Sequence, residues 1–268
     1  FVSCSVKHKK TFDYIFNKTE AITLEQSKLT LSKDITVLSF SDSSMVDRNS
    51  SIIKVDSGWI VYSKNSESSI LSFTSDGQFS GYIGHRGNGP GEYTSVYDVV
   101  VNQKSKVLEV LSDGGIFCYT FGGDFLDKKE VTYPAFSFAI DDRQNYWFYV
   151  GNNTTYGDAK MICTDENIAN VAYYLHQKSN MLPMVENNFG RNGEWLTFHE
   201  SLNHDLYTIE NGKLDLSYAM DFPNYKLPKK LHELSGMEVI EELQRSNYAS
   251  IINLSLIHIS EPTRHAQI

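Results

Sequence analysis

The chain has few cysteines, and none of them stands at a spacing that binds metal or supports redox chemistry. Only three occur in 268 residues, at Cys4, Cys118 and Cys163. So few cysteines exclude a disulfide framework, and their wide separation excludes a CxxC zinc site. Cys118 and Cys163 fall inside strand-like runs, so we expect them to be small buried side chains of a core.

Long apolar runs and clusters of positive charge are also missing. No apolar run approaches the roughly 20 residues that a membrane-spanning helix needs. The formal net charge is -9 and the isoelectric point is near 5.4. Because a nucleic-acid surface requires a basic patch or stripe, we expect no nucleic acid among the partners.

Local signatures of catalysis are absent as well. His199 and His204 flank Glu200 and Asp205, a cluster that suggests acid–base chemistry. The stretch contains neither HExxH nor the nucleophile motif GxSxG, so a solvated connection between two strands is the better interpretation.

The most diagnostic stretch that is present reads GHRGNGPGEY and places four glycines and a proline between two strand-like runs. Glycine supplies positive φ and proline fixes φ at about −65°, which are the needs of a sharply folded connection. The residues to which we assign this structural role are Gly84, Gly87, Gly89, Pro90, Gly91, Glu92 and Tyr93. We expect Glu92 to bind neighbouring backbone amides.

A phosphate-binding function does not fit this stretch. A Walker loop needs Gly-Lys-Ser/Thr leading into a helix, whereas Gly91 is followed by Glu92 and a strand. His85 and Arg86, together with Asp98 further on, are candidates for a ligand-binding face. The alternative for His85 and Arg86 is a solvated loop tip.

A repeat of short strands and hairpin turns occupies most of the chain. The last turn of each unit, at Gly77, Gly123, Glu166 and Gly212, recurs after 46, 43 and 46 residues. Four short strands with this period are typical of propeller blades, each of which buries its faces only against its neighbours. We therefore predict an all-β fold: a β-propeller of four-stranded antiparallel blades, of the six-bladed type, with about four blades present.

Tryptophan recurs on the second strand of the units, as Trp59, Trp147 and Trp195, and we expect these rings to pack between blades. A strand pair or irregular strand is expected from Leu29 to Phe40. One short helical insertion is predicted at about 229–245, after Pro228. The apolar face of that helix is expected to contain Leu231, Leu234, Ile240 and Leu243.

The motif 87–93, followed by the strand 96–101, resembles the GxGPGEF loop of six-bladed NHL-like and TolB-like propeller lipoproteins of unknown function, which occur in gut bacteria. The resemblance covers roughly residues 30–230. In that family the loop carries the chain from the outer strand of one blade to the inner strand of the next. The resemblance implies a binding or scaffolding role and provides no catalytic residue.

The two ends of the chain are expected to lie outside the propeller. A small residue before Cys4 resembles the cleavage site of a bacterial lipoprotein, so 1–28 is interpreted as a signal-peptide remnant and tether, with lipid on Cys4. The propeller then spans 29–254. Residues 255–268 resemble a translated sequencing adapter and are expected to be non-native, and a six-bladed ring would need about two further units.

These patterns lead to two functional hypotheses. The first is a non-enzymatic propeller of the cell envelope, lipid-anchored and facing the periplasm or the cell surface, that binds a glycan, peptide or protein or acts as a scaffold without a cofactor. The alternative is a metal-dependent hydrolase or lyase, with a divalent metal such as Ca²⁺ on the ring axis. Its candidate ligands are Asp98, Asp141, Asp142 and Glu186, although Asp141 and Asp142 fit more simply as hairpin residues.

Overall fold

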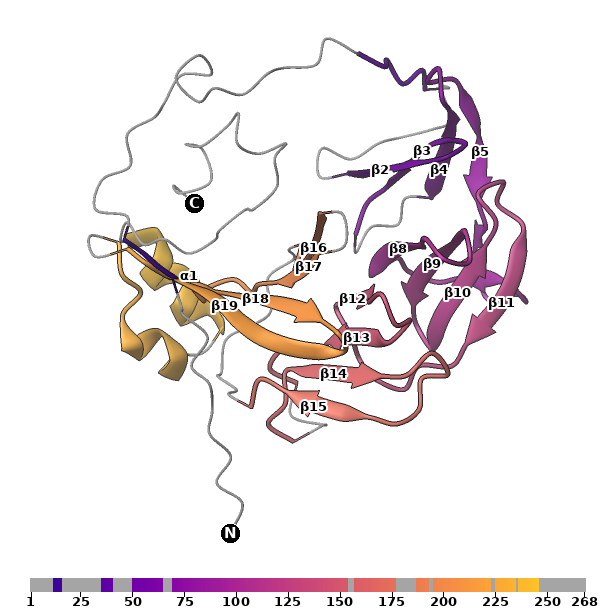
Figure 1. The fold of residues 1–268 in the computed structure, drawn as a ribbon. Coiled ribbons are helices and arrows are strands. Elements are labelled where there is room, and N and C mark those ends of the chain that lie inside the picture. The colour runs from indigo at the N-terminus through magenta and orange to yellow at the C-terminus, as the bar shows by residue number, and fades with distance from the viewer. Residues whose placement is uncertain are drawn as a thin grey trace.

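A computed structural model of the chain describes residues 12–15, 35–40, 50–64, 69–153, 157–176, 187–192, 195–222, 225–234 and 236–245. Within these ranges, four antiparallel sheets are arranged as an arc around a common centre (Figure 1). The predicted all-β propeller of four-stranded blades is confirmed. Cys4, Glu186 and the stretch 255–268 lie outside the described residues.

Each blade is built from four strands that are consecutive in the chain. Blade 1 contains β2 (Ser51–Val55), β3 (Gly58–Tyr62), β4 (Ile70–Thr74) and β5 (Phe79–Ile83), and blade 2 contains β8 (Asp98–Asn102), β9 (Val107–Ser112), β10 (Gly115–Tyr119) and β11 (Phe125–Lys129). Blade 3 contains β12 (Ser137–Ile140), β13 (Tyr146–Tyr149), β14 (Met161–Thr164) and β15 (Ala172–Tyr174), and blade 4 contains β16 (Phe189–Asn192), β17 (Trp195–Phe198), β18 (Asp205–Glu210) and β19 (Lys213–Asp221). The first strand of each blade lies toward the centre of the arc (Figure 1). A further strand, β1 (Phe12–Ile15), pairs in parallel with β19.

Three apolar clusters of the described core lie between the blades, one at each interface between successive blades. Because side chains alternate along a strand, the central strands of blades 2 and 3 each contribute to two of them. In β13, Tyr146 and Phe148 pack toward blade 2, while Trp147 and Tyr149 pack toward blade 4. The blades therefore stabilise one another through both faces, as the repeat predicted.

The tryptophans do not share one role. Trp147 is fully buried between blades 3 and 4, as expected. Trp195 is 64% exposed, because its side of blade 4 faces no described blade. Trp59 lies on the side of blade 1 that faces away from blade 2, with the Lys54 ammonium 5.3 Å from its ring centroid. Packing between blades is therefore confirmed for Trp147 and stays a prediction for Trp59 and Trp195, whose faces meet no other blade among the described residues.

Some strands and one turn of the repeat were placed incorrectly from the sequence. From the sequence we expected the first strand of blade 1 at 58–62 and that of blade 4 at 194–198, so the innermost strands β2 and β16 were missed. Residues 35–40 form only an isolated bridge from Ser39 to Gln78 instead of a strand. The residue of blade 3 equivalent to Gly77 and Gly123 is Ile168 rather than Glu166. All three donate their backbone N–H to the residue three positions earlier and have positive φ, at 89°, 100° and 58° respectively.

The predicted helix is divided into a 3-10 turn, η2 (Lys229–Glu233), and α1 (Gly236–Arg245). Both pack on Leu202, in the β17–β18 connection, through Leu231 and Val239. Ile240, which we placed on the apolar face, is 43% exposed. No helix in the described part of the chain is long and apolar enough to cross a membrane.

Candidate functional site

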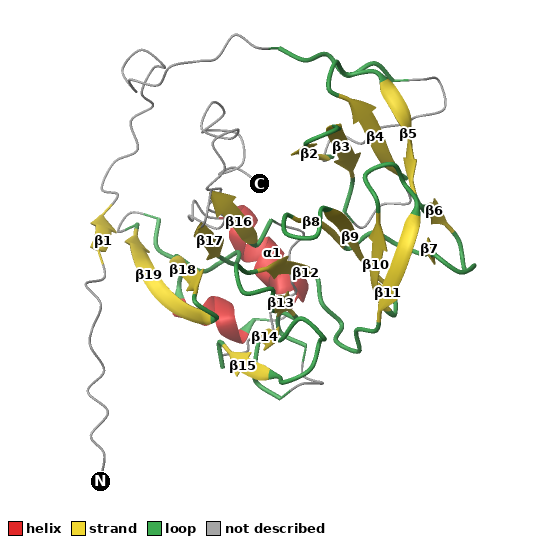
Figure 2. Cartoon of the chain, turned by 45° about the vertical axis from the view of Figure 1, so that its right-hand side comes forward, coloured by secondary structure: helices red, strands yellow, loops and turns green. Residues whose placement is uncertain are grey.

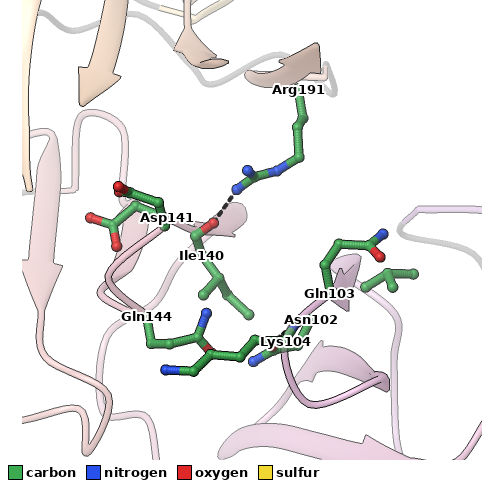
Figure 3. A pocket seen from close by; sticks show the side chains of 9 residues that line it. Asn102, Gln103, Lys104, Ile140, Asp141, Gln144 and Arg191 are labelled. Carbon is green, nitrogen blue, oxygen red and sulfur yellow. Dashed lines mark hydrogen bonds between the residues drawn. The ribbon is translucent and has the colours of Figure 1, made fainter. Parts of the chain in front are cut away.

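A cleft of about 280 Å³ lies at the inner ends of blades 2, 3 and 4 (Figure 3). The β8–β9 connection, the β12–β13 connection and strand β16 form its walls. The lining residues are Val101, Asn102, Gln103, Lys104, Ile140, Asp141, Asp142, Gln144 and Arg191.

The first wall is held by Asn102, a buried residue at the end of β8. Its Oδ1 accepts hydrogen bonds from the backbone N–H groups of Lys104 and Ser105, both at 3.2 Å. Its Nδ2 donates to Oε1 of Glu109 at 3.0 Å. Asn102 therefore fixes the turn that carries Lys104, in the way that asparagine commonly stabilises turns.

Glu109, which is 1% exposed, anchors this arrangement from inside the interface between blades 2 and 3. The Tyr146 hydroxyl donates to its Oε2 at 2.8 Å, and the Lys129 ammonium lies 3.7 Å from Oε1. Burial, reinforced by the charge of Glu109, raises the pKa of Tyr146 well above its usual value, so the phenol stays protonated as a donor. The buried carboxylate is thus compensated, as a stable interior charge must be.

The second wall is held by Asp141, immediately after β12. Its Oδ1 accepts from the backbone N–H groups of Arg143 and Asn145, both at 2.9 Å. Its Oδ2 accepts from Nδ2 of Asn145 at 2.9 Å and from Nε1 of Trp147 at 3.0 Å. With both oxygens occupied by donors of its own hairpin, Asp141 has the turn-forming role that we preferred for it.

Gln144, in the same hairpin, has a φ of +67°. A side chain in this left-handed region costs about 1–2 kcal/mol, and glycine would avoid the cost. In Figure 3 Gln144 and Lys104 extend toward each other from the two hairpins. Strained residues of this kind concentrate at binding sites, because the surrounding structure holds them in place.

The third wall contributes Arg191, whose guanidinium donates to the backbone carbonyl of Ile140 (Figure 3). Burial lowers the pKa of Arg191, while the charges of Asp141 and Asp142 raise it, and the group stays cationic. Four other lining side chains have no hydrogen-bond or ion-pair partner among the described residues. They are Gln103, Lys104, Asp142 and Gln144.

The glycine-rich stretch lies elsewhere, toward the outer rim (Figure 2). It runs from β5, the outermost strand of blade 1, to β8, the innermost strand of blade 2, and contains the short parallel pair β6 (His85–Arg86) and β7 (Glu92–Tyr93). Oε2 of Glu92 accepts from the backbone N–H of Gly89 at 2.8 Å, as we expected. The Tyr93 hydroxyl is buried and donates to the Ile83 carbonyl at 3.3 Å.

The three residues proposed for a ligand-binding face are not brought together. His85 and Arg86 are exposed on the rim, where Nε of Arg86 donates to the Thr94 carbonyl at 2.9 Å. Asp98 is buried at the start of β8, and one of its oxygens lies 2.8 Å from the Lys64 ammonium of blade 1. Its other oxygen accepts from the backbone N–H of Phe138 in blade 3 at 3.1 Å. Asp98 therefore ties three blades together.

The candidate metal ligands are likewise dispersed. Asp98 lies beside the start of β12, whereas Asp141 follows the end of that strand. Across the ranges that the structure describes, no group of three or more His, Cys, Asp or Glu side chains is placed to hold a metal ion.

The cluster around Glu200 is buried rather than solvated, which corrects our interpretation. His199 and Glu200 are both buried, and Glu200 accepts from Lys160 at 2.5 Å and from Tyr149 at 3.0 Å. Blade 3 and the β17–β18 connection are joined by these bonds, and burial raises the pKa of Asp205 nearby. His199 and Glu200 therefore belong to a packed interface, whereas His204 is half-buried, with its ring 4.8 Å from that of Phe222.

Cys118 and Cys163 are buried free thiols, as expected. Burial raises the pKa of each to about 12, and the charge of Glu109 for Cys118 and of Asp141 for Cys163 adds to the shift. Neither is a reactive thiolate near neutral pH.

Comparisons with known proteins agree with the fold. No curated protein matches the chain. A solved structure from Bacteroides fragilis NCTC 9343, named "Putative exported protein", matches with a TM-score of 0.74 and 16% identity over 89% of this chain and 70% of its own. A member of the DUF4221 family from Bacteroides vulgatus ATCC 8482 matches with a TM-score of 0.50 and 12% identity over 78% of this chain and 68% of its own. At such identities these similarities show the fold alone.

The narrower resemblance to NHL-like and TolB-like lipoproteins stays a prediction. A family match covers residues 2–258, nearly the whole sequence. The chain belongs to the family described as a domain of unknown function, DUF4934.

Proposed function

We propose that this chain is a non-enzymatic binding module of the cell envelope, and that the cleft between blades 2, 3 and 4 receives its ligand. The observation that carries the proposal is the contrast within the cleft. Its two hairpins are held rigidly from beneath by Glu109 and Asp141, while four polar side chains at their tips have no partner among the described residues. A rigid frame presenting unpaired polar groups is the arrangement that lowers the entropic cost of binding.

The envelope location is supported by the name of the Bacteroides fragilis structure and by the sequence around Cys4. We propose that Cys4 carries lipid, which places the propeller on a membrane surface through its tether. Incorporation of labelled palmitate into the natural protein, but not into its Cys4→Ser variant, is the expected result. Equal labelling of both proteins would rule out this anchor.

A closed ring of six blades is the architecture that we propose for the natural protein. The support comes from the two outer faces of the arc, where Ile52 of blade 1 is 55% exposed and Trp195 of blade 4 is 64% exposed. Further blades would cover these apolar side chains, whose exposure is unfavourable. The complete gene sequence would test this count, and the absence of two additional repeats from it would contradict six blades.

The binding function is tested by probing glycan and peptide arrays with the full-length protein and repeating each positive spot with cleft variants. We expect signals that fall when Gln103 or Lys104 is replaced by alanine. Signals that stay unchanged in both variants would show that the ligand binds outside the cleft. The absence of any signal on both arrays would favour a scaffolding role.

The Gln144→Gly variant separates binding from folding. Glycine adopts a φ of +67° without strain, so we expect the free energy of unfolding to stay equal or to rise by up to about 1 kcal/mol. Ligand affinity should fall, because an amide facing the cleft is lost. Thermal unfolding and titration of the same preparation check both expectations, and a destabilised variant with unchanged affinity would contradict them.

A further inference from the structure

We propose that the ligand of this cleft is a sugar acid, a saccharide that presents a carboxylate beside its hydroxyl groups, with Lys104 and Arg191 binding the carboxylate. This inference rests on the proposed function and goes beyond it by naming the ligand chemistry. It follows from the charges, the amides and the apolar content of the lining.

The charges favour an anion. The Lys104 ammonium has no ion-pair partner among the described residues. Arg191 donates to one backbone carbonyl, and a guanidinium has five N–H donors in a planar fork that suits a carboxylate. The lining also holds the carboxylates of Asp141 and Asp142. Both oxygens of Asp141 accept hydrogen bonds within its own hairpin, so Lys104 and Arg191 are the lining groups that can contact an anion.

The amides favour hydroxyl groups. A hydroxyl both donates and accepts, so it is best recognised by neighbouring groups that do the same. Gln103 and Gln144 each provide an amide with both capacities, and Asp142 provides acceptors. These three side chains come from two different blades, so they can contact different parts of one compact polar ligand.

The apolar content disfavours the competing ligands. The lining contains no aromatic ring, and its apolar side chains are Val101 and Ile140 alone. Peptide recognition usually depends on pockets that hold large apolar or aromatic anchors, and no aromatic side chain lines this cleft of about 280 Å³. A neutral saccharide would lack both a stacking surface and a charge partner, so charge must supply the affinity.

The test is isothermal titration of the full-length protein with trisaccharides of galacturonate, of mannuronate and of hyaluronan. The methyl ester of each bound acid is its matched neutral control, since it keeps every hydroxyl. A Glu-rich hexapeptide tests the competing class. We expect at least one acid to bind, its ester to bind at least tenfold more weakly, and affinity to fall as salt rises.

Two lysines of the same turn provide matched variants. Lys104→Gln should weaken binding at least tenfold. Lys106→Gln should change it less than twofold, because that ammonium pairs with Asp56 at 2.9 Å instead of lining the cleft.

Four results would overturn the inference: no binding of any acid at millimolar concentration, equal binding of acid and ester, equal effects of the two lysine variants, or preference for the hexapeptide. A neutral glycan or peptide whose binding is still abolished by Lys104→Gln would leave the proposed function intact. A ligand affinity that stays unchanged in every cleft variant would instead contradict the proposed function itself.

Discussion

Replacing Asp98 by alanine is expected to lower the free energy of unfolding by about 3–5 kcal/mol, measured by urea denaturation. Asp98 is buried at the start of the inner strand β8, with an oxygen 2.8 Å from the Lys64 ammonium. Its removal leaves that ammonium almost buried without its anion and leaves the Phe138 backbone N–H without an acceptor. Blades 1, 2 and 3 all lose a contact at once.

The control is a double variant that also removes the charge of Lys64. In the Asp98→Ala variant the main cost is the Lys64 ammonium, which stays almost buried without its anion. The double variant Lys64→Met with Asp98→Asn removes that charge and should therefore be more stable than the Asp98→Ala variant. A loss below about 1 kcal/mol for Asp98→Ala would show that the pair behaves like an exposed ion pair. It would also remove the reason for excluding Asp98 from a ligand-binding face.

Replacing Gly91 by valine is expected to cost about 3 kcal/mol or more, also measured by urea denaturation. Gly91 has a φ of +75°, where a side chain costs about 1–2 kcal/mol. An added Cβ would also lie 2.6 Å from the Phe125 ring, and such overpacking typically costs about 1–3 kcal/mol. The Gly91 carbonyl accepts a hydrogen bond from the Tyr119 hydroxyl at 2.9 Å, so the backbone at Gly91 has little freedom to move away from the Phe125 ring.

Gly157 provides the matched control for this substitution. Its φ is +66°, and a Cβ there would meet no atom of the described residues within 4 Å. Gly157→Val should therefore show the backbone strain alone, and the excess cost at Gly91 measures the packing of the connection. Equal losses in the free energy of unfolding for Gly91→Val and Gly157→Val would contradict a role of the stretch 84–93 in packing blade 1 against blade 2. Loss of ligand binding by Gly91→Val at an unchanged melting temperature would make the stretch a binding loop.

The fold could be predicted from sequence because its signals are local. Asp76-Gly77 and Asn211-Gly212 mark hairpins, in which Gly77, Asn211 and Gly212 adopt positive φ, and the regular spacing of the turns reveals the blades. Of the two inner strands that were missed, β2 contains β-branched residues typical of a strand, whereas β16 lacks such signals. The strand β16 contains Gly190 and Arg191 instead of alternating apolar residues, so it forms through pairing with β17 rather than through its own preference.

The candidate site could not be predicted, because its side chains are brought together only by the tertiary structure. Lys104 and Arg191 are 87 positions apart in sequence and reach one cleft only when blades 2 and 4 flank blade 3. Gln144 gives no sign in the sequence of its positive φ. Asp98 and Glu200 looked like exposed candidates because acidic residues usually are exposed, whereas here Lys64 and Lys160 allow each to be buried at an interface.

The most direct test of the account is amide hydrogen exchange of the full-length protein, with and without a ligand identified on the arrays. We predict protection of the two hairpins around Asn102–Lys106 and Asp141–Asn145 and no change in the stretch 84–93. Protection of 84–93 around His85 and Arg86, with unchanged exchange at both hairpins, would contradict the account.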